Sequence, residues 1–228
     1  MGLPSGQDVP LDSLLSVATD AARQGGAVLA ECTRNGFHIE LKQTINLVTN
    51  ADHQAEQQII DVIHAAFPDH PVLAEERGLS EHCPSRYKWV IDPLDGTTNF
   101  AHGFPAYCVS VGVECDGRGI IGVVYDPTRD ELFTAQMGHG AYLNGIPISV
   151  STTDHLDRAL LVTGFAYNIR ETTNNNLNHF ARFALKVQGL RRTGTAALDL
   201  CYVAAGRFDG FWEVTLNPWD MAAGVVIL

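Results

Sequence analysis

Two aspartates that follow a short apolar run carry the clearest chemical signal in the sequence. Residues 89–91 (Trp-Val-Ile) are typical of a buried strand and lead into Asp92; Pro93 predicts a turn, Asp95 follows, and residues 96–98 indicate the start of a helix. Two carboxylates on one turn repel each other, and a cation between them relieves that repulsion. The free N–H groups at the start of a helix favour an anion. A hard cation beside a phosphate-sized anion site predicts a metal-dependent phosphatase.

Two further acidic residues stand where they could join this pair. The apolar run 72–74 leads into Glu75, and Asp220 lies just inside a helix that Pro218 helps to start. These carboxylates, with one main-chain carbonyl, form an oxygen-only ligand set that suits Mg2+ and argues against zinc. The alternative for Asp92 and Asp95 is structural, because aspartate is common in turns beside proline and glycine.

Apolar periodicity predicts the elements that must position these carboxylates. Helical spacing runs from residue 11 to about residue 32 and again over 51–67, where proline ends it. Asn144-Gly145 is a hairpin signal within a region of short runs rich in Val, Ile, Tyr and Phe. The predicted strands are 107–114, 119–125, 131–136, 159–163 and 208–214, and the later predicted helices are 176–187 and 195–205. The sequence therefore predicts an α/β protein with mixed sheets.

Three motifs resemble the signature set of the inositol monophosphatase family. They are Asp-Pro-Leu-Asp-Gly-Thr-Thr-Asn-Phe at 92–100, Glu75-Glu76, and Trp-Asp-x-Ala-Ala-Gly at 219–224, in the family's order. The resemblance runs from about Lys42 to the last residue. It implies alternating layers of helices and mixed β-sheets of the inositol monophosphatase and fructose-1,6-bisphosphatase type, with the metal site between two halves. It also implies a Mg2+-dependent, lithium-sensitive phosphatase of small phosphomonoesters that forms a homodimer.

The resemblance divides the predicted ligands between two Mg2+ positions. Asp92 would bridge both ions, Glu75 and the Leu94 main-chain carbonyl would complete one position, and Asp95 and Asp220 would complete the other. Metal pairs of this kind clamp the attacking and leaving oxygens of a displacement. A weaker third metal position is implied near Glu75.

Asp52, Thr97 and Glu75 are the predicted catalytic residues. Asp52 and Thr97 match the family pair that orients the attacking water, and Glu75 acts through the metal it holds. Both Thr97 and Asp52 have an alternative role as a helix cap. No Ser/His/Asp or Cys/His arrangement stands out in the sequence, which favours direct attack by metal-activated water over a covalent intermediate.

A second set of residues is predicted to bind the substrate. The N–H groups of Gly96 and Thr97 would hold phosphate oxygens, and Glu213 would accept a hydrogen bond from a substrate hydroxyl unless it is an exposed charge at a strand end. Lys42 matches a basic residue on a loop of the family, with an isolated surface lysine as the alternative. The complete predicted substrate set is Asp95, Gly96, Thr97, Gly194, Thr195, Ala196 and Glu213.

The composition of the chain argues against nucleic acid and membrane as binding partners. The chain has 228 residues and a formal net charge of -11, so nucleic-acid phosphate repels it and we expect no nucleic-acid partner. The five cysteines are odd in number and form no Cys-x-x-Cys, which predicts reduced thiols. Residues 1–10 lack the features of a signal peptide, and no run of about 18 apolar residues predicts a membrane span. We therefore expect a cytoplasmic protein without a membrane partner.

The predicted domain division is an N-terminal tail at 1–10 and one inositol monophosphatase-like domain at 11–228. The apolar run 225–228 ends the sequence, whereas protein ends are normally polar, so we expect a domain truncated at its C-terminus relative to the family.

The identity of the substrate stays open at this point. Thr98 favours the inositol type, because relatives that act on phosphoadenosine phosphate tend to carry lysine there. One alternative is a histidinol-phosphate or sugar-phosphate phosphatase. The other is a regulatory member of the family that binds proteins and has weak catalysis.

Overall fold

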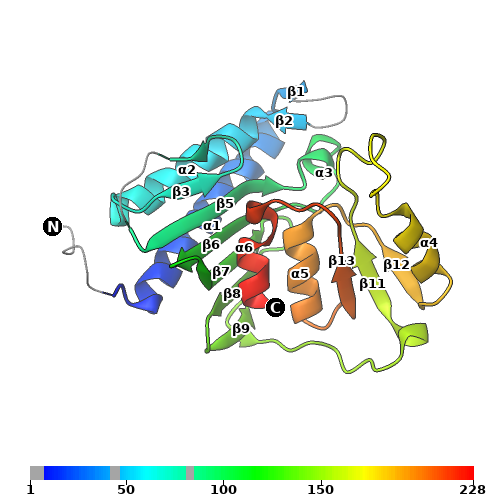
Figure 1. Cartoon of the computed structure of the whole chain (residues 1–228). Helices are drawn as coiled ribbons and strands as arrows, with labels where there is room; N and C mark the ends of the chain where they lie inside the picture. Colours follow the sequence, from blue (N-terminus) through cyan, green and yellow to red (C-terminus); the bar gives the residue numbers. More distant parts are fainter. Residues whose placement is uncertain (1–7, 42–46, 81–84) are drawn as a thin grey trace.

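Layers of helices and sheets alternate through the molecule. The computed structural model describes residues 8–41, 47–80 and 85–228. The helices are α1 (Leu11–Asn35), α2 (Asn50–Ala66), α3 (Thr97–Ala101), α4 (Leu177–Ala184), α5 (Ala196–Ala204) and α6 (Pro218–Ile227), with a short 3-10 helix at Leu156–Arg158. In Figure 1, α1 and α2 cover one face of the large sheet and α6 the other, with α5 beside it, and α4 lies beyond the small sheet. This is the alternating arrangement that the family resemblance implies.

The large sheet has eight strands in the order β10-β9-β8-β7-β6-β5-β3-β4. Its strands are β3 (Val72–Ala74), β4 (Gly78–Leu79), β5 (Tyr87–Asp95), β6 (Cys108–Cys115), β7 (Arg118–Asp126), β8 (Glu131–Gln136), β9 (Gly140–Leu143) and β10 (Ile146–Pro147). Only the β3–β5 pair is parallel among the described strands of this sheet. Because β3 and β5 run in the same direction, their C-terminal ends lie at the same end of the sheet, and Glu75 and Asp92 lie there.

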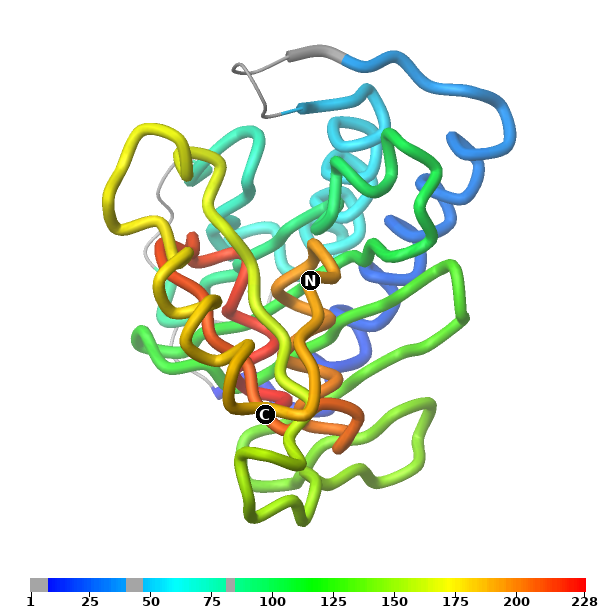
Figure 2. The backbone as a smooth tube through the Cα atoms, turned by 90° about the vertical axis from the view of Figure 1, so that its right-hand side faces the viewer, coloured from blue at the N-terminus to red at the C-terminus, as the bar shows by residue number. Residues whose placement is uncertain are grey.

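The smaller sheets complete the topology. A parallel sheet has the order β12-β11-β13, and β1 pairs with β2 in a separate antiparallel ladder. Their strands are β11 (Leu160–Thr163), β12 (Gly189–Arg191), β13 (Gly210–Trp212), β1 (Ile39–Leu41) and β2 (Leu47–Thr49). In Figures 1 and 2 the segment between β11 and α4, coloured yellow, projects from the same end of the molecule as α3 and the start of α2.

The main core lies between the large sheet and its helices. Helices cover both faces of β5, so its central residues are almost entirely buried, Trp89 and Ile91 included. On the opposite face α6 lies very close to the sheet, because a Cβ on Gly112 would stand 2.9 Å from the Ala222 side chain. That close packing places the first turn of α6, with Asp220, beside the end of β5.

Most predicted elements are confirmed, and one local prediction is wrong. The hairpin at Asn144-Gly145 forms between β9 and β10 with φ of 49° and 78°, as the sequence predicts. Pro93, however, does not make a turn. The strand continues from Asp92 to Asp95, and the pairing register with β6 shifts between these residues, which forms a bulge. Proline has no N–H for the ladder, and a bulge accommodates it within the strand.

Among the described residues, no helix has the length and apolar character needed to cross a lipid bilayer.

Candidate active site

One acidic cavity collects nearly all of the predicted site residues. It has a volume of about 430 Å³ and lies between the large sheet, α5, α6 and the loop after β11. Asp52 does not line it but lies directly behind Thr97. The predicted residues that line the cavity are Glu75, Asp92, Leu94, Asp95, Gly96, Thr97, Gly194, Thr195, Ala196, Glu213 and Asp220. Residues separated by more than 140 positions in sequence thus face one space.

The β5 bulge aims both of its aspartates into this cavity. Asp92 is 2 % exposed, and one of its oxygens accepts a hydrogen bond from the Leu94 N–H at 3.0 Å. Asp95 Oδ2 accepts from the Ala197 N–H at 2.8 Å, which joins the end of β5 to the first turn of α5. Gly96 follows with φ of 99°, in the left-handed region that favours glycine. The bulge and this glycine together turn the chain into α3.

The carboxylates of the cavity repel one another strongly. Burial, and then the negative charges of Glu75, Asp95 and Asp220, raise the pKa of Asp92 well above its ordinary value. Burial also raises the pKa of Asp95, with Asp220 as the next cause that acts in the same direction. Burial raises the pKa of Asp220 as well. A cation in this cavity would reverse these shifts, because it stabilises the charged form of each group.

The donor chemistry of the cavity fits a hard divalent cation. The described residues contain no set of three or more Asp, Glu, His or Cys side chains already drawn to metal-ligating spacing. The cavity nevertheless offers the carboxylates of Glu75, Asp92, Asp95 and Asp220, and its described lining contains no His or Cys. Oxygen donors of this kind suit Mg2+ rather than zinc.

Thr97 and Asp52 form a buried pair at the back of the cavity. Thr97 Oγ1 lies 3.2 Å from Asp52 Oδ1 and 3.1 Å from the Leu94 carbonyl oxygen, so its single hydroxyl hydrogen has two acceptors. Asp52 Oδ2 accepts from the Thr49 N–H and hydroxyl, each at 2.7 Å. One oxygen of Asp52 completes the capping box at the start of α2, and the other faces Thr97, so the role of Asp52 in orienting water stays a prediction. Thr97 does not cap α3, because Gly96 occupies the N-cap position.

Asp220 is held by the start of its own helix. Its Oδ2 accepts from the Asn217 N–H at 2.7 Å, and Pro218 is the first residue of α6, as the sequence predicts. A carboxylate in the first helical turn also interacts favourably with the helix dipole. One oxygen of Asp220 is thus engaged by the backbone of the turn before the helix.

A polar region lies on the side of the cavity toward the small sheet. Glu213 is half-buried and lines the cavity, so it is not a solvated charge at a strand end. Burial raises its pKa to about 7, although the Arg192 charge acts in the opposite direction. Its carboxylate lies against Gly164, where any side chain would collide with it. Gly194, with φ of 92°, likewise leaves space that the Arg192 guanidinium approaches.

Sequence reasoning did not predict several residues that line this cavity, and three of them are polar residues close to Glu213 or to the loop after β11. Asp199 is 1 % exposed and accepts from the Thr193 hydroxyl at 2.6 Å; burial raises its pKa to about 8. Arg192 and Tyr167 also line the cavity. A carboxylate inside the apolar run of α5 was the available signal for Asp199, whereas the loop that carries Tyr167 gave none. Lys42 lies outside the described residues.

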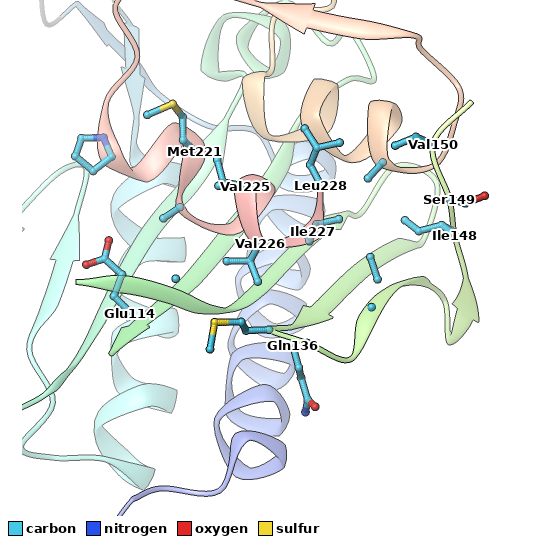
Figure 3. A pocket seen from close by; sticks show the side chains of 18 of the residues that line it. Glu114, Gln136, Ile148, Ser149, Val150, Met221, Val225, Val226, Ile227 and Leu228 are labelled. Atoms are coloured by element: carbon cyan, nitrogen blue, oxygen red, sulfur yellow. The ribbon is translucent and has the colours of Figure 1, made fainter. Parts of the chain in front are cut away.

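A second cavity of about 750 Å³ lies against the outer side of α6. Figure 3 shows Met221 and Val225 of this helix, and Leu228 directly after it, lining the cavity, with Glu114 and Gln136 near its edge. Its lining is mainly apolar, and it contains none of the predicted site residues.

Comparison with known proteins places this arrangement in a family. The family model described as the inositol monophosphatase family matches residues 10–228. The chain is 48% identical over 219 residues to the inositol-1-monophosphatase of Synechocystis sp., which covers 96% of this chain and 76% of that protein. It is 44% identical over 217 residues to the Nus factor SuhB of Escherichia coli (strain K12), covering 94% of this chain and 81% of that protein.

A solved structure agrees with these sequence matches. The inositol monophosphatase from Anabaena (Nostoc) sp. PCC 7120 superposes with a TM-score of 0.86 at 46% identity, covering 96% of this chain and 81% of that one. The chain therefore belongs to the inositol monophosphatase family.

Proposed function

We propose that this chain is a Mg2+-dependent phosphomonoester hydrolase whose preferred substrate is myo-inositol monophosphate. One observation carries the proposal: Glu75, Asp92, Asp95 and Asp220 line a single cavity that the Thr97–Asp52 pair closes at the back. Membership of the inositol monophosphatase family and the similarity to a protein named inositol-1-monophosphatase support the reaction class.

The acidic residues would hold the metal ions. Asp92 would bridge two Mg2+ ions, with Glu75 and the Leu94 carbonyl on one side and Asp95 and Asp220 on the other. When bound, Mg2+ neutralises charge on the phosphate and makes water a better nucleophile. Without metal ions the cavity would repel a phosphate ester, because its several negative charges outweigh the positive charge of the nearby Arg192 guanidinium.

Thr97 and Asp52 would orient the attacking water and move its proton. The Thr97 hydroxyl can donate to Asp52 Oδ1 at 3.2 Å while its lone pair accepts a hydrogen from water in the cavity. As the water oxygen bonds to phosphorus, its proton passes to Thr97 and the hydroxyl hydrogen passes to Asp52. Burial raises the pKa of Asp52, which makes its carboxylate a better proton acceptor. The bond from phosphorus to the substrate oxygen breaks, and that oxygen takes up a proton from solvent to leave as the alcohol, while Asp52 later releases the proton it accepted to solvent.

The polar region beside α5 would bind the alcohol part of the substrate. Glu213 can accept from a hydroxyl, and Arg192 can donate to one, so the region suits a polyhydroxylated ring better than an apolar group. The N–H groups of Gly96 and Thr97 would contact phosphate oxygens. Gly194, Thr195 and Ala196 would contact the ring. On the family resemblance we also expect Li+ inhibition and a homodimer.

A regulatory function is the second candidate, and one observation favours it. The chain is 44% identical to proteins named Nus factor SuhB, close to its 48% identity to the Synechocystis inositol-1-monophosphatase. A protein that acts mainly through partners could keep the acidic cavity and turn over substrate slowly.

Steady-state turnover separates these candidates. The purified chain would be assayed with myo-inositol 1-phosphate, histidinol phosphate and a hexose phosphate, each with Mg2+ and with excess chelator. The proposal expects chelator-sensitive turnover, highest kcat/KM for the inositol ester, and inhibition by millimolar Li+. Higher kcat/KM for another ester would replace the substrate assignment. Phosphate release that is undetectable with every ester, from a folded protein in Mg2+, would contradict the proposal and favour the regulatory function.

A further inference from the structure

Glu56 is a fully buried carboxylate that the reaction described above does not use. It lies on α2, four residues after Asp52, so both side chains project from the same side of the helix. Glu56 is 0 % exposed and Asp52 is 1 % exposed. Burial raises the pKa of both groups. A buried carboxylate is costly unless specific partners offset its loss of water, so the partners of Glu56 indicate what it does.

The first partner is the backbone of the turn that carries a predicted metal ligand. Glu56 Oε2 accepts a hydrogen bond from the Glu76 N–H at 2.9 Å. Residues 75–77 form the turn of the β3–β4 hairpin, whose ladder pairs Ala74 with Gly78. Glu75 is the first residue of that turn. Since the peptide unit between Glu75 and Glu76 is planar, fixing the Glu76 N–H also fixes the orientation of the Glu75 carbonyl and restricts its Cα.

The second partner is a cation from the same turn. Glu56 Oε1 lies 3.2 Å from Arg77 Nε as an ion pair, but it makes no aligned hydrogen bond with any described residue. Arg77 in turn donates through Nη2 to Gln57 on the outer surface of α2, at 2.6 Å. The turn is therefore tied to α2 through a backbone N–H on one side and a guanidinium on the other.

This arrangement favours positioning over simple stabilisation. A buried ion pair is often no better for stability than apolar residues of the same volume. A carboxylate is nevertheless suited to holding a particular N–H, because its oxygens accept charge-assisted hydrogen bonds. Glu75 and Asp92 line the same cavity, and the charge of Glu75 contributes to the raised pKa of Asp92.

We propose that Glu56 is a positioning residue for the metal site, which fixes the 75–77 turn through the Glu76 N–H so that Glu75 faces Asp92. The proposal rests on the proposed function, because it takes Glu75 to be a metal ligand. Together with Asp52, which holds Thr97, it makes α2 a helix that supports the cavity from behind at two consecutive turns.

The test measures metal binding directly, with Mn2+ as the probe. Glu56→Met keeps the shape of the side chain and removes its acceptor, whereas Glu56→Gln keeps an acceptor oxygen. Free Mn2+ would be counted by electron paramagnetic resonance, and the Mg2+ concentration for half-maximal turnover would be determined alongside kcat. We expect Glu56→Met to weaken metal binding about tenfold, the scale of one charge-assisted hydrogen bond, with kcat at saturating metal within about twofold of wild type. Glu56→Gln should stay within about threefold of wild type in metal affinity.

Asp126 provides a matched control. It is also 0 % exposed, it holds a turn by accepting from the Thr128 N–H at 2.8 Å, and it pairs with Arg129 at 2.8 Å, but it does not line the acidic cavity. Asp126→Asn should lower the melting temperature and leave Mn2+ affinity unchanged. If Glu56→Met does not fold, Glu56→Asp serves instead, because the shorter side chain keeps its charge and loses its reach to Glu76.

The outcomes separate this inference from the proposed function. Unchanged Mn2+ affinity in Glu56→Met or Glu56→Asp, with a wild type that binds Mn2+ and hydrolyses substrate, overturns the inference alone. Equal weakening by Glu56→Met and Asp126→Asn would also overturn it, since the effect would then be one of general stability. A wild type that neither binds Mn2+ nor releases phosphate overturns the proposed function and this inference together.

Discussion

Two cavities flank α6, and the smaller of them contains most of the groups that could carry out chemistry. The acidic cavity has about 430 Å³ and the apolar one about 750 Å³. The same helix lines both, because Asp220 faces the acidic cavity and its neighbour Met221 faces the apolar one. Adjacent helical residues point about 100° apart, which allows one helix to serve two different surfaces.

Residue chemistry, and not volume, is the reason to propose the smaller cavity as the active site. The larger cavity exposes side chains such as Val225, which is 61 % exposed, and offers few polar groups to orient a ligand. The smaller one gathers carboxylates with raised pKa values from β5 and α6, and Glu75 from the turn after β3 lines the same cavity. Buried, mutually repelling groups lower stability, and such groups are typical of sites kept for function.

The largest expected effect is that of removing the central charge of the acidic cavity. Asp92→Asn should lower kcat by on the order of a thousandfold, because metal ions supply several kcal/mol of transition-state stabilisation. The same change should raise the melting temperature of the metal-free protein, since it removes charge repulsion. Turnover and thermal melting in chelator would be measured on one preparation. Near-normal turnover in this variant would show that Asp92 does not bridge the ions.

A smaller effect is expected at the substrate side of the same cavity. Glu213→Gln should reduce kcat/KM for myo-inositol monophosphate by about tenfold, which corresponds to one charge-assisted hydrogen bond of about 1.5 kcal/mol. Hydrolysis of an aryl phosphate, which has no ring hydroxyl to bind, should change little and serves as the control. Equal losses with both esters would assign Glu213 to the metal site or the fold. Unchanged kinetics with both would leave it without a role in binding.

The acidic cavity should also make metal-free stability depend on pH. The pKa values of Glu213 and Asp199 are about 7 and about 8 in the folded chain, above the unfolded values near 4. A carboxyl whose pKa is raised by folding stabilises the fold at low pH, and that contribution is lost as the pH rises through the folded value. The melting temperature in chelator should therefore fall as the pH rises from about 4 to about 8, and level off above that. Saturating Mg2+ should reduce the fall, and a rise over this range in chelator would contradict the account.

The apolar cavity should contribute nothing to turnover. Val225→Lys places a charge on its exposed wall, five residues after Asp220. We expect kcat within about twofold of wild type and less self-association at high concentration, because the exposed apolar area is reduced. Light scattering and the inositol phosphate assay would measure the two properties. A large loss of turnover in a folded variant would mean that the two cavities are coupled through α6.

The acidic residues that the sequence assigned to one site do share one cavity, because they lie in contiguous motifs, and their roles stay predictions. Asp92 and Asp95 lie in the last part of β5 and Asp220 in the first turn of α6, and the apolar patterns that predict these two elements are local in the sequence. The bulge at Pro93 was not predictable in the same way, since it depends on the register with β6.

The sequence did not predict residues whose surroundings come from distant parts of the chain, because no local pattern reveals those contacts. Glu56 resembles any polar residue of an amphipathic helix until its partner in the 75–77 turn is known. Asp199 appears as a single charge in an apolar helix, and only folding places it near Glu213 and Arg192. Buried carboxylates that lie outside a recognisable motif therefore mark the limit of reasoning from local pattern.

Anomalous diffraction from crystals grown in Mn2+ would test the central claim most directly. Mn2+ replaces Mg2+ at oxygen sites and can be located by its own scattering. The account predicts anomalous peaks in the acidic cavity, one beside Glu75 and Asp92 and one beside Asp92, Asp95 and Asp220, and no peak in the apolar cavity. Crystals of an enzyme that hydrolyses phosphate esters in Mn2+, but with no peak at Asp92, would contradict it.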